Sequence, residues 1–298
     1  MKERWKFGGM LTRLIMINVG VFLVLSLTAV IITLSGGNAE SILIQWVELP
    51  SDLHVLAMRP WTLFTYMFAH SSIWHILFNM LWLWWFGQLF LTIGTQRELV
   101  ALYIYGGLGG ALLYLIAYAT MPYFNDVHGM MLGASASVLA IVVATAWRMP
   151  DYKVGLLFIG AVAIKWIAGV AVLLSLLNVT GENAGGNIAH IGGALVGMIY
   201  GVAMNRGVDI TSPLNKLIDT IVNAVRKIGT KQSTATPRYH RSAAGSTGTT
   251  YAETSRSGLT REDQDRMNDI LDKIKKSGYA ALTSEERRIL FDVSKRVK

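Results

Sequence analysis

The chain has 298 residues, of which 52% are hydrophobic and only 15% are charged. This composition is too apolar for an ordinary soluble enzyme, and the apolar residues fall in separate blocks, so the sequence predicts a multi-pass membrane protein. The sequence has no cysteine for disulfide or thiolate chemistry, and its six histidines form no zinc signature, so no metal or other cofactor is expected. The net charge of +8 comes from basic residues that flank the apolar blocks, which indicates membrane topology rather than nucleic-acid binding.

Two apolar blocks open the chain. Residues 10–34 follow a basic N-terminus and exceed the length of a signal-peptide core, so we expect a first membrane span there. The connection 35–61 contains tryptophans and apolar patches, and we expect it to lie partly at the membrane interface. The second span is predicted over residues 62–91. It carries His75 and Asn79 four residues apart, on one helix face, where they can donate to a common oxyanion or serve only as a cap and an interhelical bond.

The third span, predicted over residues 99–120, contains a glycine-rich run at 106–110. That run lacks the strand and the Lys-Ser/Thr of a phosphate loop, so it predicts close helix packing. The fourth span, residues 132–147, begins with small residues and places Ser135 and Ser137 in its first turn. A serine there usually packs against a neighbour or bonds to its own helix, but it can also be a nucleophile.

The last two spans follow a polar turn at residues 149–153. Residues 154–178 are longer than one span needs, so we expect 154–160 at the interface and the fifth span to begin near Ala161, with Lys165 reaching the headgroups. The sixth span, residues 188–204, carries His190. An ionisable side chain at that depth indicates a functional site, and a serine and a histidine on neighbouring helices are the minimal parts of a nucleophile with its general base.

The membrane domain is therefore predicted over residues 1–205. The basic residues favour six spans with both termini in the cytoplasm, and we expect a multi-pass protein of a bacterial plasma (inner) membrane. Beyond it we expect an amphipathic interfacial helix at 206–229, a flexible linker at 230–258 and a helical hairpin at 259–298, whose second helix starts at a capping box, Thr283–Glu286. So small a hairpin needs a docking partner, which the sequence does not identify.

Three motifs occur in one order along about residues 61–200. They are His75-x-x-x-Asn79, Gly133-x-Ser135 and Ala189-His190-x-x-Gly193-x-x-x-Gly197. Together they resemble the rhomboid family of intramembrane serine proteases. The resemblance implies an all-α membrane protein, a six-transmembrane-helix bundle, here followed by a cytoplasmic C-terminal tail that ends in a short helical hairpin.

The resemblance also implies residue roles. Ser135 matches the nucleophile, His190 the general base, and His75, Asn79 and the Ser135 backbone N–H the oxyanion donors. His70 matches an earlier histidine of the same stretch. No acidic third member is evident on the matching spans, so we expect a Ser-His dyad that cleaves transmembrane protein substrates inside the lipid bilayer.

The alternative is a non-catalytic rhomboid-like membrane chaperone or adaptor, which keeps the fold without the chemistry. A transporter is a further class, but the sequence shows no inverted repeat. Four residues differ from those that are common in the family. Ala136 occupies a position where Gly is common, Leu139 one where some members have Tyr, Thr62 one where Arg is frequent, and Leu91 one where Glu is frequent. All the matched dyad and oxyanion residues are present, which favours a protease.

Overall fold

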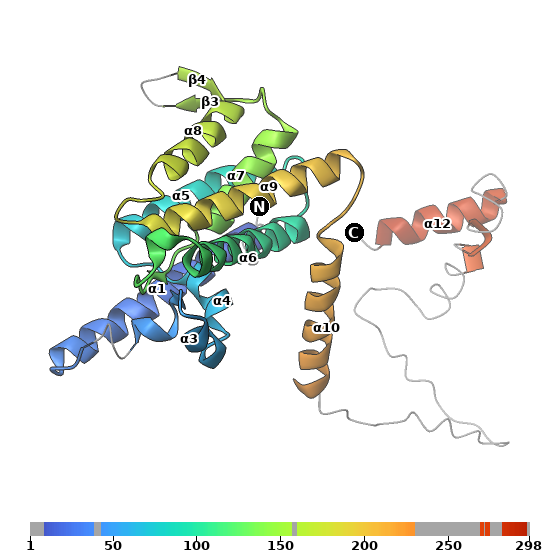
Figure 1. Cartoon of the computed structure of the whole chain (residues 1–298). Helices are drawn as coiled ribbons and strands as arrows, with labels where there is room; N and C mark the ends of the chain where they lie inside the picture. The colour runs from blue at the N-terminus through green and yellow to red at the C-terminus, as the bar shows by residue number, and fades with distance from the viewer. Residues whose placement is uncertain are drawn as a thin grey trace, which may run out of the picture. The chain divides into compact units, whose positions relative to one another are not determined.

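The structure is a computed structural model that describes residues 9–38, 43–156, 160–229, 269–270, 272–274 and 282–296. The chain divides into two compact units, Met1–Gln232 and Ser233–Lys298. The first unit is mostly helical, as predicted, and Figure 1 shows its main helices gathered in a bundle. Its longer helices are α1 (Met10–Leu34), α5 (Ile73–Phe90), α6 (Gln96–Thr120), α7 (Ser135–Arg148), α8 (Ile164–Leu177), α9 (Ala184–Asn205) and α10 (Ser212–Gly229).

Three of the described helices, α1, α6 and α9, are long and apolar enough to cross a membrane. Helices α7 and α8 are apolar but have only 14 residues each. At 1.5 Å per residue each spans about 21 Å, which is less than the roughly 30 Å hydrocarbon core. The membrane character of the fold is thus clear, while the count of six spans stays a prediction.

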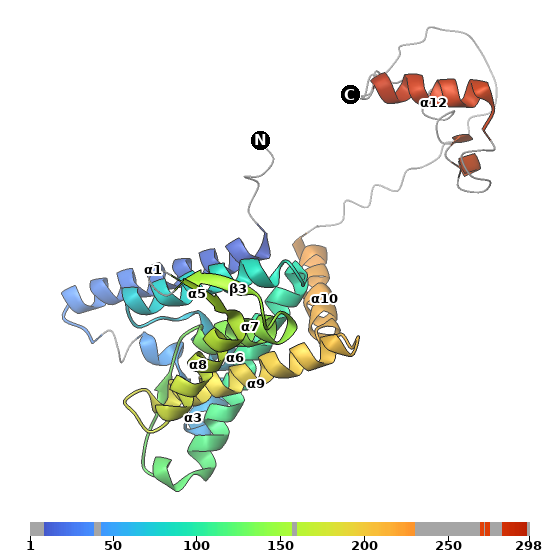
Figure 2. The same ribbon diagram turned by 90° about the horizontal axis from the view of Figure 1, so that it is seen from above.

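Helices α6, α7 and α9 form the centre of the bundle, and α6 and α9 lie side by side in both views (Figures 1 and 2). Glycine makes the close approach possible. A Cβ added at Gly193 or Gly197 of α9 would run into the backbone carbonyl oxygen of Ala136 or Ala140 of α7. On α6, a Cβ at Gly110 would lie 2.7 Å from the Ala136 side chain. The predicted packing role of the glycine-rich run is confirmed.

The second predicted span is broken into pieces. Residues 62–91 form α4 (Thr62–Thr65), the 3-10 turn η3 (Tyr66–Phe68), an extended break, and then α5. Ser72 ends the break because its hydroxyl accepts the backbone N–H of His75 at 3.2 Å and so caps α5. The prediction of one continuous span was wrong, because it extended across the polar residues His70, Ser71 and Ser72, where the helix is interrupted.

Two short antiparallel strand pairs qualify the all-α prediction. Strand β1 (Leu49–Pro50) pairs with β2 (Met130–Met131), and β2 is a two-residue strand shortly before the serine cluster. Strands β3 (Lys153–Leu156) and β4 (Gly160–Ala163) form a hairpin in which Val154 faces Val162. The fifth helix therefore begins at Ile164, not near Ala161.

Other boundaries also shift. Lys165, expected to reach the headgroups, forms an ion pair with Asp151 at 2.6 Å. Helix α6 starts at Gln96, before the predicted 99, because Thr95 and Glu98 form a capping box. Helix α9 starts at Ala184, before the predicted 188. Between the long helices lie η2 (Ile44–Trp46), α3 (Leu53–Met58) and η4 (Pro122–Phe124).

The amphipathic helix α10 begins where Asp209 accepts the backbone N–H of Thr211 at 2.8 Å and its hydroxyl at 2.7 Å. The Thr211 hydroxyl is the main reason why the pKa of Asp209 lies below its ordinary value. The predicted linker, 230–258, lies outside the described residues.

In the second unit, α12 (Ser284–Arg296) starts at the predicted capping box. The Thr283 hydroxyl accepts the Glu286 N–H at 3.3 Å, and a Glu286 oxygen accepts the Thr283 N–H at 2.7 Å. That prediction is confirmed. Of the first predicted helix of the hairpin, residues 269–270 and 272–274 are described, and they are helical.

Candidate active site

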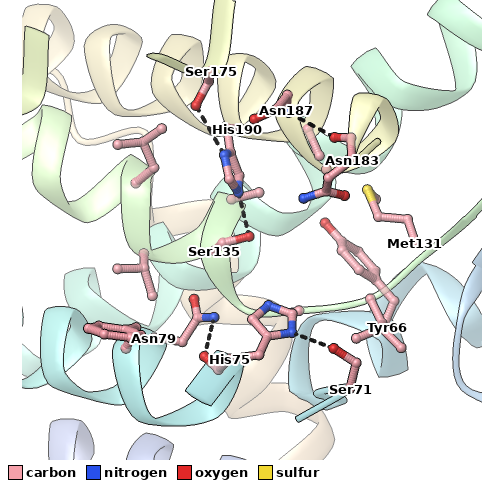
Figure 3. Close-up of a pocket in the computed structure, with 18 of the residues that line it drawn as sticks. Tyr66, Ser71, His75, Asn79, Met131, Ser135, Ser175, Asn183, Asn187 and His190 are labelled. Atoms are coloured by element: carbon pink, nitrogen blue, oxygen red, sulfur yellow. Dashed lines mark hydrogen bonds between the residues drawn. The ribbon is translucent and has the colours of Figure 1, made fainter. Parts of the chain in front are cut away.

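Ser135 and His190 come together from two different helices. Ser135 is the first residue of α7 and His190 lies in the second turn of α9. The Ser135 Oγ lies 2.7 Å from the His190 Nε2, a hydrogen-bonding distance, and the close contact of the two helices holds the pair in place (Figure 3). A serine with its hydroxyl on an imidazole nitrogen has the geometry of a nucleophile beside a general base.

Gly133 lies just before α7 and borders both Ser135 and His75. Its φ of +126° is a conformation that residues with a side chain rarely adopt, and its N–H donates to the carbonyl of Tyr66 at 2.9 Å. A Cβ on this residue would lie 2.8 Å from the His75 Nε2 and 3.8 Å from the Ser135 Oγ. The missing side chain therefore leaves open a small space that the histidine ring and the serine hydroxyl both border.

His75 and Asn79 lie across Ser135 from His190 (Figure 3). The Asn79 amide nitrogen donates to the His75 carbonyl at 2.9 Å, which occupies one of its two hydrogens. The His75 Nδ1 lies 3.1 Å from the Ser71 hydroxyl, so the ring is held and its Nε2 faces the space beside Gly133. The sequence predicted that both side chains face one target, and in the structure both line the same cavity as Ser135.

All four residues line one cavity of about 760 Å³. Its walls are largely apolar, and α5 contributes three aromatic side chains, Trp74, Phe78 and Trp82. A pocket of this size can accept several residues of an extended chain. Polar groups gather near His190, where Asn178, Asn183 and Asn187 line the same cavity.

Ser137 and His70 do not join this arrangement. Ser137 is fully buried on the opposite face of α7, and a Cβ added at Gly107 of α6 would lie 2.9 Å from its Oγ. Its hydroxyl makes no hydrogen bond within the described residues. His70 is buried with its ring edge against His75, the centroids 5.0 Å apart, and its ring nitrogens likewise have no hydrogen-bond partner in the part of the chain that is described.

Two serines of the site were missed by the sequence analysis. Ser175 of α8 places its Oγ 3.1 Å from the His190 Nδ1, and Ser71 makes the matching contact with His75. Ser175 interrupts a run of leucines, and a single hydroxyl in so apolar a helix is a signal that could have been followed. Ser71 carries no such signal, because it lies in a polar stretch.

The residues that depart from common family patterns have apolar or local surroundings. Leu139 is buried and lines the cavity. Thr62 is buried and donates its hydroxyl to the carbonyl of Arg59 at 2.7 Å. Ala136 sits between Gly193 and Gly110, where only a small side chain fits. None of them disturbs the contact between Ser135 and His190.

Ser135 and His190 are thus paired at the wall of a cavity within a bundle of apolar helices. The family described as Rhomboid domain matches residues 57–207, half of the chain. The chain therefore belongs to the rhomboid family.

Similar curated proteins include the presenilin-associated rhomboid-like protein A of Danio rerio, 30% identical over 139 residues, which are 45% of this chain and 34% of that protein. Rhomboid protein 1 of Saccharomyces cerevisiae is 27% identical over 48% of this chain and 41% of its own length. RHOMBOID-like protein 12 of Arabidopsis thaliana is 31% identical over 49% of this chain and 47% of its own length. The chain thus matches less than half the length of each relative.

These relatives are all named as mitochondrial proteins, which contradicts the expected bacterial plasma membrane. The expectation was wrong because the distribution of basic residues reports how a chain is oriented across a membrane, not which membrane it occupies.

Proposed function

We propose that this protein is an intramembrane serine endopeptidase that cleaves transmembrane protein substrates with a dyad of Ser135 and His190. The observation that carries the proposal is the 2.7 Å contact between the Ser135 Oγ and the His190 Nε2 at the wall of the cavity. Membership in the rhomboid family supports it.

The geometry supports acyl transfer to the serine. The His190 Nε2 takes the hydroxyl proton as the Ser135 Oγ attacks the scissile carbonyl, and the same nitrogen returns the proton to the leaving amine. A water then repeats the cycle on the acyl-enzyme. Among the residues that the structure describes, no carboxylate is hydrogen-bonded to His190, which favours a dyad over an acidic triad.

The oxyanion would occupy the space that Gly133 leaves open. The backbone N–H of Ser135 is available there because the first intrahelical hydrogen bond of α7 is donated further along, by Val138 to the carbonyl of Ala134 at 2.9 Å. The His75 Nε2 and the second amide hydrogen of Asn79 supply side-chain donors, and the helix N-terminus adds a favourable dipole.

The short length of α7 supports a reaction at membrane depth. A helix of 14 residues falls about 9 Å short of the hydrocarbon thickness, so a site at its N-terminus lies below one membrane surface if Arg148, its last residue, lies at the other. The cavity then gives water and an unwound substrate segment a route to Ser135.

The test is proteolysis in proteoliposomes with a panel of single-span substrates. The full-length chain is compared with Ser135→Ala and His190→Ala, and products are read by mass spectrometry. We expect one defined cleavage with the unchanged chain and none with either variant. A folded chain that binds these substrates and cleaves none would favour the alternative, a non-catalytic membrane chaperone or adaptor.

A further inference from the structure

Ser175 occupies the side of His190 that faces away from Ser135. It is 5% exposed, and its Oγ makes two contacts, one with the His190 Nδ1 at 3.1 Å and one with the backbone carbonyl of Ala171, one turn back on α8, at 3.0 Å. Figure 3 shows Ser175, the His190 ring and Ser135 as a continuous chain of hydrogen bonds. The mechanism above uses only the hydrogen bond between His190 and Ser135.

The two contacts of Ser175 decide where the protons lie. A hydroxyl has one hydrogen to donate, and a carbonyl oxygen can only accept. The hydrogen of Ser175 therefore goes to the Ala171 carbonyl, and the Oγ accepts from His190. If that hydrogen pointed at the ring instead, two oxygens without a proton between them would face each other at 3.0 Å.

A neutral histidine that donates from Nδ1 has no hydrogen on Nε2. The free electron pair of the Nε2 then faces the Ser135 hydroxyl at 2.7 Å and can accept its proton. The opposite tautomer would carry a hydrogen on Nε2 and could not act as the base. His190 can therefore act as the base for Ser135 only in the Nδ1–H tautomer.

We propose that Ser175 is a positioning residue that holds His190 in the Nδ1–H tautomer, with the Nε2 free to accept the proton of Ser135. This inference rests on the proposed proteolytic function for its consequence, though not for the tautomer itself. Ser175 takes the orienting place that a buried aspartate has in soluble serine hydrolases.

A hydroxyl suits this place better than a carboxylate. Helix α8 is apolar, and its leucines on either side of Ser175, such as Leu174 and Leu176, are exposed to the surroundings of the bundle. A charged group within an apolar membrane helix is costly, whereas a serine bonded to the preceding turn is neutral and satisfied. Ser175 therefore orients the base without placing a charge in the bundle.

The test compares Ser175→Thr with Ser175→Val in the full-length chain. The two replacements have the same shape, and only threonine keeps a hydroxyl that can bond to the preceding turn. Nitrogen-15 spectra of histidine-labelled protein in detergent report the tautomer, with the His190 signals assigned by their loss in His190→Gln. Turnover of a cleaved model substrate is measured in parallel.

We expect Nδ1–H in the unchanged chain and in Ser175→Thr. In Ser175→Val we expect a mixture of tautomers and a roughly tenfold fall in kcat with little change in KM, the size expected for one lost orienting hydrogen bond. Ser175→Ala serves in its place if the valine variant does not fold. A hydrogen on the Nε2 in the unchanged chain, or an unaltered tautomer and kcat in Ser175→Val, would overturn the proposal.

The two proposals fail separately. If the unchanged chain cleaves no substrate, the proposed function fails, and the nitrogen-15 spectra alone decide the role of Ser175. If cleavage depends on Ser135 and His190 but not on the hydroxyl at position 175, the function stands and this inference falls.

Discussion

At the scale of single residues, the account depends on the small space beside Gly133. Three groups border it: the His75 Nε2, the Ser135 Oγ, and the backbone that Gly133 turns with its positive φ. A substrate carbonyl oxygen placed there meets donors that are already held, since Ser71 holds His75 and the helix backbone holds Asn79. Donors fixed in advance are what stabilise a charge that appears only during the reaction.

Removing either side-chain donor should slow turnover without unfolding the protein. We expect His75→Ala and Asn79→Ala each to lower kcat by roughly tenfold to a thousandfold, the range for the loss of one oxyanion donor. Gln88→Ala, an exposed position of the same helix, is the control and should leave kcat unchanged. The measurement is kcat per folded molecule alongside thermal stability in detergent.

A different result would contradict the role of these residues as oxyanion donors. If Asn79→Ala or His75→Ala lowers the melting temperature strongly while each folded molecule turns over substrate at the normal rate, the residue serves only as a cap or an interhelical contact.

Sequence reasoning found the residues that a motif marks and missed those that only the fold brings near. Ser135, His190, His75 and Asn79 stand at fixed spacings, so a pattern can mark them. Ser175 reaches His190 from a different helix, and no spacing along the chain encodes that approach. Its polarity within a leucine run was visible, but its target was not.

At the scale of elements, the contact between α7 and α9 carries the site. Gly193 and Gly197 let the α9 backbone rest on the carbonyl oxygens of Ala136 and Ala140, and the same contact fixes the distance from His190 to Ser135. A small separation of the two helices would lengthen that hydrogen bond. Packing and chemistry therefore depend on the same surface.

Gly197→Ala should impair both the packing of α9 on α7 and the rate of cleavage. The added Cβ would meet the Ala140 carbonyl carbon at 3.0 Å and its oxygen closer still, and backbone atoms cannot move aside cheaply. We expect a loss of about 1–3 kcal/mol in stability, as for overpacking in a core, together with reduced turnover. The check is thermal unfolding in detergent and a cleavage assay.

Gly20→Ala on α1 is the matched control, because nothing lies within 4 Å of a Cβ at that position. It should be neutral or slightly stabilising, since alanine favours helix over glycine. Equal effects of the two substitutions would contradict the packing argument.

The elements show where apolar patterns mislead. The pattern predicted most helices of the bundle, yet the predicted second span was extended across the polar residues before α5, where Ser72 caps a new helix. It also did not predict the strand hairpin in which Val154 pairs with Val162. Caps and strand pairing depend on particular hydrogen bonds, and a count of apolar residues does not record these.

At the scale of the whole molecule, the site lies entirely within the first unit, Met1–Gln232. Helix α10, at the end of that unit, exposes Leu217, Ile221 and Val222, and an ion pair of 3.0 Å joins its Asp219 to Arg97 of α6. We propose, as the sequence predicted, that α10 rests on the membrane surface with these side chains among the lipids.

A chain that ends at Gly229 should therefore keep its peptide-bond chemistry. It retains every residue that lines the cavity, so we expect cleavage of a single-span substrate at nearly the normal rate. The same truncation carrying Ser135→Ala is the control for background proteolysis. Complete loss of activity in a truncated chain that still folds would show that the second unit takes part in catalysis rather than in docking or regulation.

The central claim is that Ser135, and not Ser137, is the nucleophile. Residues two apart on a helix point about 200° apart, so only one of them can face His190. Ser135 meets the His190 Nε2 at 2.7 Å, while Ser137 is buried against α6 without a hydrogen bond in the described structure.

Labelling with a serine-directed fluorophosphonate, mapped by mass spectrometry, tests this claim most directly. We predict a label on Ser135 in the unchanged chain, full labelling in Ser137→Ala, and none in Ser135→Ala. Ser137→Ala should also fold normally, because it removes a hydroxyl that makes no hydrogen bond to any residue the structure describes. A label that persists in Ser135→Ala and disappears in Ser137→Ala, or a folded chain that takes no label at all, would contradict the account.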